Sequence, residues 1–182
     1  MSAAALSKFY WGFLFIMVDF RLNGIDLLPD IVGFILFAVG FGLLAAESDY
    51  FNQARKLNMV MIILSIFSIY EAPAQDGGIH IAPDWPLGLI IGICSLVFTL
   101  LVVYNLFMGI RELAERAGRH ELAAEAEQRW KQFLILQVAG AGAFLIIFIP
   151  PLAFLYIISL FVASIILTVL IMGFIKRCEQ SL

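Results

Sequence analysis

LGLIIGICSLVFTLLVVYNLFMGIRELAERAGRHELAAEAEQRWK, residues 87 to 131, contains the pattern that decides the fold. Its first part, 87 to 110, holds no charged residue, and as a helix it is long enough to cross about 30 Å of hydrocarbon. Its second part, 111 to 131, is rich in charged residues and is interrupted by Gly118. We therefore predict a membrane helix that continues into water, turns near Gly118 and returns as the start of the next helix.

Charged residues in the segment 111 to 131 recur with a spacing of four, which places them on one face of a helix. In every case the glutamate comes first, the order that stabilises an exposed helix. The expected pairs are Glu112 with Arg116, Glu115 with Arg119, Glu125 with Arg129, and Glu127 with Lys131. The spacing predicts a helical, solvated hairpin.

Five further apolar stretches flank this region. The six stretches span about 5 to 23, 27 to 46, 54 to 71, 87 to 110, 132 to 149 and 152 to 175. Because 63% of the 182 residues are hydrophobic and only 14% are charged, the chain has too few polar side chains to cover a water-soluble domain. The sequence predicts a single domain over residues 1–182, an all-α, polytopic integral membrane protein. It would be a bundle of six transmembrane helices with a cytoplasmic helical hairpin at 111–131.

The basic residues predict how the chain threads the membrane. If the N-terminus is cytoplasmic, ten of the eleven Lys and Arg residues lie inside and only Arg21 lies outside. The ten are Lys8, Arg55, Lys56, Arg111, Arg116, Arg119, Arg129, Lys131, Lys176 and Arg177. Cytoplasmic segments of membrane proteins carry such an excess of Lys and Arg. We expect a multi-pass protein of the cell membrane with both termini in the cytoplasm.

The connection between the first two apolar stretches predicts a tight helical hairpin. Asn23 and Gly24 favour a left-handed stop for the first helix. Asp26 is suited to cap the next helix, and Pro29 is suited to its first turn. The first helix is therefore expected to end near 23 and the second to begin near 27.

Polar residues gather around this turn and form the candidate ligand-binding site. Its members, all expected near the outer ends of the first three helices, are Asp19, Arg21, Asn23, Asp26, Asp30 and Glu71. At about 1.5 Å per residue, Asp19 falls about 7 Å below the turn. An ionised group at that depth needs a partner or has a function, and Arg21 is expected to pair with Asp30. A purely structural ion pair and an outward-facing ligand pocket both account for this pattern.

Small residues mark places where helices are expected to approach closely, because they let two backbones come near each other. Gly88 and Gly92 have the GxxxG spacing, and Ala38 lies one turn before Gly42. These positions are predicted to pack within the bundle rather than against a second copy of the chain.

The sequence contains no HExxH, GxSxG, CxxC or phosphate-binding glycine loop. Asp76, His80 and Asp84 are suitable ligand types for a metal, but Gly and Pro between them remove any regular geometry. We therefore predict no metal site and no cofactor. The net charge of −3 also argues against a nucleic-acid partner. A non-enzymatic role is favoured.

Three functions fit these features. The leading interpretation is a small membrane protein that binds a solute or a lipid headgroup at the outer cluster, in transport or sensing. In that interpretation the hairpin at 111–131 is a docking surface for a cytoplasmic or membrane protein partner. The second interpretation is an accessory or scaffold subunit whose helices pack against a larger membrane complex and whose polar cluster is structural. The third is a lipid-modifying enzyme that uses Asp19, Asp26 or Asp30.

Overall fold

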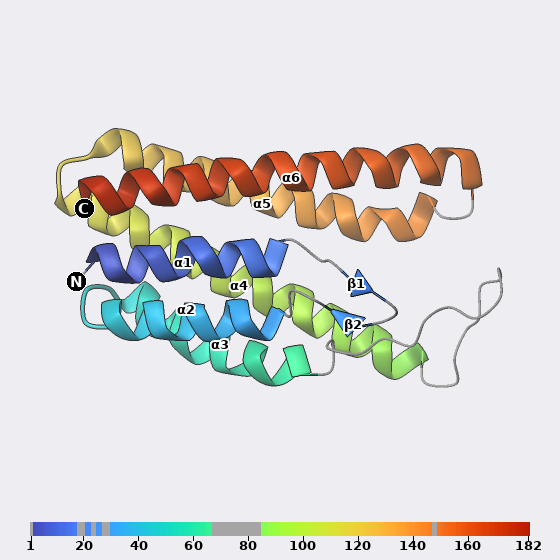
Figure 1. Cartoon of the computed structure of the whole chain (residues 1–182), viewed down its shortest axis with the longest axis horizontal. Helices are drawn as coiled ribbons and strands as arrows, with labels where there is room; N and C mark the ends of the chain where they lie inside the picture. The colour runs from blue at the N-terminus through green and yellow to red at the C-terminus, as the bar shows by residue number, and fades with distance from the viewer. Residues whose placement is uncertain (1, 18–20, 23–24, 27–29, 67–84, 147–148) are drawn as a thin grey trace.

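The computed structural model describes residues 2–17, 21–22, 25–26, 30–66, 85–146 and 149–182, and these contain the six predicted helices. The helices are α1 (Ser2–Met17), α2 (Asp30–Leu44), α3 (Asp49–Ile66), α4 (Trp85–Arg116), α5 (His120–Ile146) and α6 (Pro150–Ser181). Each helix packs against its neighbours in sequence, and α6 also packs against α1 (Figure 1). The result is a closed ring of side-by-side helices.

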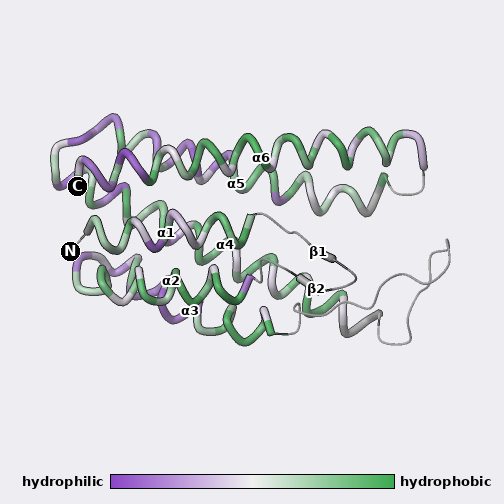
Figure 2. The backbone as a smooth tube through the Cα atoms, viewed as in Figure 1, coloured by the Kyte–Doolittle hydropathy of each residue, from purple (hydrophilic) through white to green (hydrophobic). Residues whose placement is uncertain are grey.

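The bundle has two different ends. One of them, which we call the polar end, carries both termini, the α2–α3 turn and the α4–α5 turn (Figure 1). Hydrophilic residues gather here along α5 and α6 (Figure 2). Apart from Arg21, the Lys and Arg residues lie in the helix halves that lead to this end or in the α4–α5 turn. The opposite end, called the far end, carries the only two strands among the described residues.

The connection between α1 and α2 differs from the predicted helical hairpin. The structure ends α1 at Met17 and contains two short strands, β1 (Arg21–Leu22) and β2 (Ile25–Asp26). They pair antiparallel, with Arg21 opposite Asp26. The predicted helix to residue 23 and the predicted capping by Asp26 are therefore wrong. The physical reason is that the Asn-Gly dipeptide between the strands is also a strong two-residue turn signal for a β-hairpin.

The predicted α4–α5 hairpin is confirmed. α4 continues past the apolar run to Arg116, and α5 begins at His120. Gly118 has a φ of +69°, a left-handed conformation that glycine adopts without a steric penalty.

At the other end of α5, α6 begins directly at Pro150, and prolines occupy its first positions. Proline is well suited there because the first turn of a helix does not need its N–H groups.

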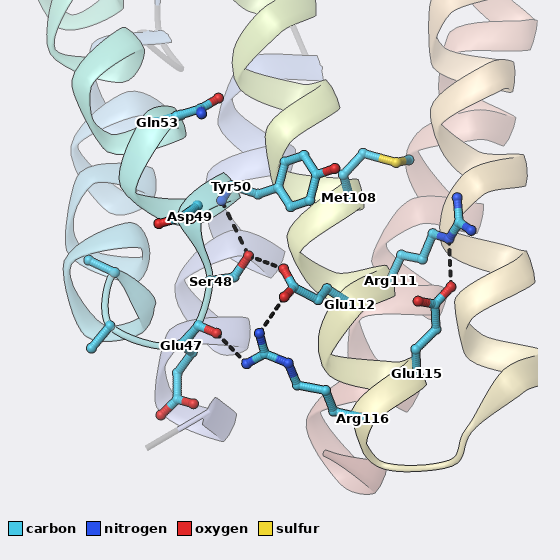
Figure 3. Close-up of a pocket in the computed structure, with 12 residues that line it drawn as sticks. Glu47, Ser48, Asp49, Tyr50, Gln53, Met108, Arg111, Glu112, Glu115 and Arg116 are labelled. Carbon is cyan, nitrogen blue, oxygen red and sulfur yellow. Dashed lines mark hydrogen bonds and ion pairs between the residues drawn. The ribbon is translucent and has the colours of Figure 1, made fainter.

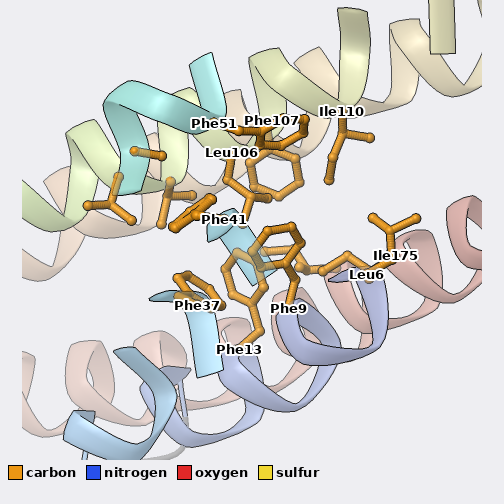
Figure 4. Packing of buried hydrophobic residues seen from close by; sticks show 14 of the residues in the cluster. Leu6, Phe9, Phe13, Phe37, Phe41, Phe51, Leu106, Phe107, Ile110 and Ile175 are labelled. Atoms are coloured by element: carbon orange, nitrogen blue, oxygen red, sulfur yellow. The ribbon is translucent and has the colours of Figure 1, made fainter. Parts of the chain in front are cut away.

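Phenylalanine side chains fill the centre of the ring on the side of the polar end (Figure 4). The rings of Phe9 and Phe41 lie 4.9 Å apart, which joins α1 to α2. Phe107 lies 5.9 Å from Phe13 and 6.0 Å from Phe174, so it links α1, α4 and α6. Aromatic rings at these separations gain stability beyond the burial of their area. This cluster holds the helices that are most distant in sequence.

Glycines allow close packing, but not at Gly42, Gly88 and Gly92, three of the predicted positions. A Cβ atom at Gly33 would lie 2.8 Å from the carbonyl oxygen of Gly12, so the backbones of α1 and α2 nearly touch. Gly42, Gly88 and Gly92 have no described atom within 4 Å of such a Cβ. The described residues thus place the tight helix contact between α1 and α2 and leave the GxxxG face of α4 uncovered.

Among the described residues, two helices are long and apolar enough to cross a membrane: Gly88–Arg116 within α4, and Pro150–Ser181. Only 22% and 17% of their most apolar windows are buried inside the protein. The core helix of a water-soluble domain would be mostly buried. α1 and α2 are apolar but shorter.

Candidate functional site

The structure describes only part of the predicted outer cluster. Three of its members lie outside the described residues: Asp19, Asn23 and Glu71. Arg21 and Asp26 are brought together, because the pairing of β1 with β2 places them directly opposite each other. Asp30 lies in the first turn of α2, where the helix dipole favours an acidic residue. The predicted pairing of Arg21 with Asp30 stays a prediction.

A well-described polar site lies at the other end of the molecule. A pocket of about 810 Å³ opens between the α2–α3 turn and the last turns of α4 (Figure 3). Residues 45–50 and Gln53 form one wall, and Met108, Arg111, Glu112, Glu115 and Arg116 form the other. The segment 111–131 was predicted to be a docking surface, so this pocket includes its first part and adds the α2–α3 turn to it.

Ser48 organises the first wall because it caps α3. The backbone N–H of Tyr50 donates to Ser48 Oγ at 3.2 Å, and the N–H of Phe51 donates to the Ser48 carbonyl oxygen at 3.1 Å. Serine is favoured at this position because it satisfies N–H groups that have no partner within the helix. The Ser48 hydroxyl in turn donates to Glu112 Oε2 on α4. The same hydroxyl thus starts a helix and joins the two walls.

Arg116 makes the second connection across the pocket. Its Nη1 donates to the carbonyl oxygen of Glu47 at 2.6 Å, and its Nη2 donates to Glu112 Oε1. The Glu112 carboxylate therefore has one oxygen on Ser48 and the other on Arg116 (Figure 3). A carboxylate held at both oxygens keeps a fixed orientation. The Glu112 and Arg116 pair is one of those predicted from the spacing of four.

The neighbouring predicted pair is wrong. Glu115 accepts from Arg111 Nε at 2.8 Å and not from Arg119. α4 ends at Arg116, and the left-handed residue Gly118 turns the chain before Arg119, which therefore does not share a helix face with Glu115. Helix geometry gives a partner only while the helix continues.

A second ion-pair network joins α5 to α6. Glu125 Oε1 accepts from Arg129 Nη2 at 2.6 Å, as predicted, and also from Arg177 Nη2 at 2.5 Å. Burial tends to raise the pKa of Glu125, but the hydrogen bonds and charges of Arg177 and Arg129 outweigh it and hold this pKa below the ordinary value. Glu127 pairs with Lys131 at 2.7 Å, again as predicted, and the hydrogen bond from Lys131 lowers its pKa.

The charges that line the pocket are unbalanced. Four carboxylates face two guanidinium groups, which gives a formal charge of −2: Glu47, Asp49, Glu112 and Glu115 against Arg111 and Arg116. Both arginines already contact carboxylates. Glu47 and Asp49 are exposed, and their carboxylates have no partner in the described part of the chain. The pocket is therefore suited to a cationic group.

Among the residues described, no three His, Cys, Asp or Glu side chains converge in a way that could hold a metal ion. Sequence reasoning identified Glu112 and Arg116 but missed Ser48 and the carbonyl of Glu47, because they come from a turn far away in the chain. Comparison of the chain with protein-family models, with curated proteins and with solved structures finds no match.

Proposed function

We propose that the protein is a non-enzymatic, multi-pass membrane protein that serves as an accessory subunit and binds a cationic segment of a partner protein at its polar end. The observation that carries this proposal is the pocket of about 810 Å³ with a preorganised wall and an excess of negative charge. Because Ser48 and Arg116 already satisfy Glu112, the carboxylates of Glu47 and Asp49 are the groups left for a ligand.

The membrane arrangement belongs to the same proposal. All six helices cross the bilayer, and the polar end faces the cytoplasm, where Lys and Arg residues concentrate. The exposed apolar surfaces of α4 and α6 support this arrangement, because large apolar surfaces are unfavourable in water. The pocket would then open toward cytoplasmic segments of a membrane complex.

Peptide binding tests the pocket. A fluorescent peptide of alternating Lys and Ser should bind the full-length protein in neutral nanodiscs, and a peptide with Glu in place of Lys should not. Loss of one exposed charge pair is worth about 0.2–1 kcal/mol, so Glu47→Gln should weaken binding by about threefold. Glu121→Gln is the matched control, because it removes an exposed carboxylate at the same end outside the pocket. Equal weakening by both variants would mean general charge attraction and would reject the pocket.

We also propose a second function, binding of a solute or lipid headgroup at the far end. The supporting observation is the strand register, which places Arg21 opposite Asp26 and so provides Arg21 with a structural neighbour. Asp19 would then be the carboxylate that binds the ligand. Asp19→Asn should keep the melting temperature and lose a small molecule that copurifies and is detected by native mass spectrometry. Loss of folding instead would assign Asp19 to the structure and remove this function.

A further inference from the structure

An apolar groove of about 390 Å³ lies between α5 and α6, away from the polar-end pocket. Ala139 on α5 and Ala163 on α6 both line it, and larger side chains such as Ile135, Ile166 and Leu170 form its sides. The small alanines leave a hollow between two helices that are otherwise covered with branched side chains. Ligand sites in proteins begin at about this size, roughly 300 Å³.

The end of the groove nearest the polar end is positively charged. Gln132 lines the groove, and its Oε1 accepts from Arg129 Nη1 at 2.8 Å. Arg129 and Arg177 share the single carboxylate of Glu125, at 2.6 and 2.5 Å, which leaves one positive charge in excess. Arg129 Nε is buried and has no hydrogen-bond partner among the described residues. Arg177 is half exposed, and its Nη1 lies 3.7 Å from the position of a Cβ at Gly173, one helical turn from the groove-lining residue Leu170.

We propose that this groove binds an anionic phospholipid from the cytoplasmic leaflet, with an acyl chain between α5 and α6 and the phosphate beside Arg129 and Arg177. The inference rests on the membrane orientation proposed above and not on the polar-end pocket. Charge complementarity indicates the occupant, because the groove is apolar along its length and cationic only at its cytoplasmic end. An anionic phospholipid matches both parts: its acyl chain is apolar and its phosphate is negatively charged. Basic pockets between membrane helices on this side are known to suit lipid headgroups.

Lipid retention tests the headgroup contact. The full-length protein is taken from nanodiscs of phosphatidylcholine and phosphatidylglycerol, and the retained lipids are counted by native mass spectrometry. Phosphatidylglycerol should be preferred, and Arg177→Gln should reduce this preference by about fivefold, the effect of one basic residue near a membrane surface. Lys176→Gln is the matched control, since Lys176 is an exposed neighbour that pairs with Glu179 instead. Equal effects of the two variants would overturn the proposal.

A second variant tests the groove itself. Ala163→Leu fills the hollow at an exposed position and should lower the retention of phosphatidylglycerol, while Val162→Leu, outside the groove, should not. Unchanged melting temperatures establish that both variants fold. Retention unaffected by Ala163→Leu would overturn the proposal, as would displacement of the lipid by excess inorganic phosphate. A dimer that Ala163→Leu dissociates would assign the groove to a second copy of the chain and equally reject the lipid.

Failure of this inference is distinguishable from failure of the proposed function. The peptide assay in neutral nanodiscs depends on Glu47 and does not involve the groove. Inverted topology would show directly in the labelling experiment described below. If the protein binds the basic peptide but retains no phosphatidylglycerol, the polar-end pocket is supported and only the lipid site is rejected.

Discussion

The two halves of α6 both contain long apolar runs but have different surroundings. Toward the polar end, Ile171 and Phe174 are fully buried in the phenylalanine cluster. Toward the far end, Ala153 is the only buried residue before position 167, and Phe154 and Phe161 are 67% and 64% exposed. The difference lies in what covers the helix: α1, which packs against α6, ends at Met17. Apolar sequence therefore does not identify the core here, and in the proposed membrane arrangement lipid would cover the far half.

The largest expected effect concerns which side of the membrane each end occupies. With Cys94 and Cys178 replaced by Ala, a cysteine at Asp76 should react with an impermeant maleimide added to intact cells. A cysteine at Gly118 should remain unlabelled, because the concentration of Lys and Arg residues at the polar end predicts that this end faces the cytoplasm. Labelling of Gly118→Cys from outside would mean that the polar end faces the outside. The pocket would then not open toward the cytoplasm.

The next prediction compares the two halves directly. Phe107→Ala should destabilise the protein by about 3–5 kcal/mol, because it leaves a cavity at the centre of the ring. Phe161→Ala removes the same atoms from an exposed position and should change stability by less than about 0.5 kcal/mol. Thermal unfolding in detergent measures both. Similar losses would mean that an unseen protein contact covers the far half.

Glycine substitutions sharpen the comparison within α2. Gly33→Ala should cost about 1–3 kcal/mol, since the new Cβ would press on the backbone of α1 at Gly12. Gly42→Ala meets no described atom and replaces a poor helix former, so stability should stay the same or rise by about 0.5–1 kcal/mol. Unfolding of the two variants under the same conditions is the measurement. Loss of stability in Gly42→Ala would place a packing partner against that face.

The smallest expected effect is the acid sensitivity of the polar end. The pKa of Glu125 is lower in the folded protein than in the unfolded chain, so the unfolded chain binds the proton more tightly. The contribution of Glu125 is complete above the unfolded pKa and disappears as pH falls through the folded pKa. Glu125→Gln should therefore show a shallower loss of melting temperature on acidification. Identical pH profiles would mean that Arg129 and Arg177 do not hold Glu125 ionised.

Sequence reasoning succeeded where both partners lie on one continuous helix. The spacing of four found Glu112 with Arg116 because helix geometry alone brings them together. It failed at Glu115, whose expected partner lies beyond the end of α4. The Asn-Gly dipeptide was misread because it is compatible with both a helix end and a β-hairpin, and only the flanking backbone distinguishes them.

Contacts between distant segments gave no local signal. Ser48 and Glu112 are 64 residues apart, and Arg177 and Glu125 are 52 apart. Serine before a helix predicts a cap, but nothing in its neighbourhood predicts the glutamate that its hydroxyl reaches. The same holds for Gly12 and Gly33, whose contact depends on how α1 crosses α2. These features come from packing, which a single sequence does not encode locally.

The closure of the ring by α6 against α1 has a consequence for biosynthesis. A ribosome delivers α1 first and α6 last, so the first helix to leave it waits for a partner at the other end of the chain. The glycine contact with α2 can form as soon as two helices exist. The face of α1 that packs against α6 obtains its neighbours only after α6 has been made. Until then a nascent chain must shelter that face by other means, through lipid or an insertion factor.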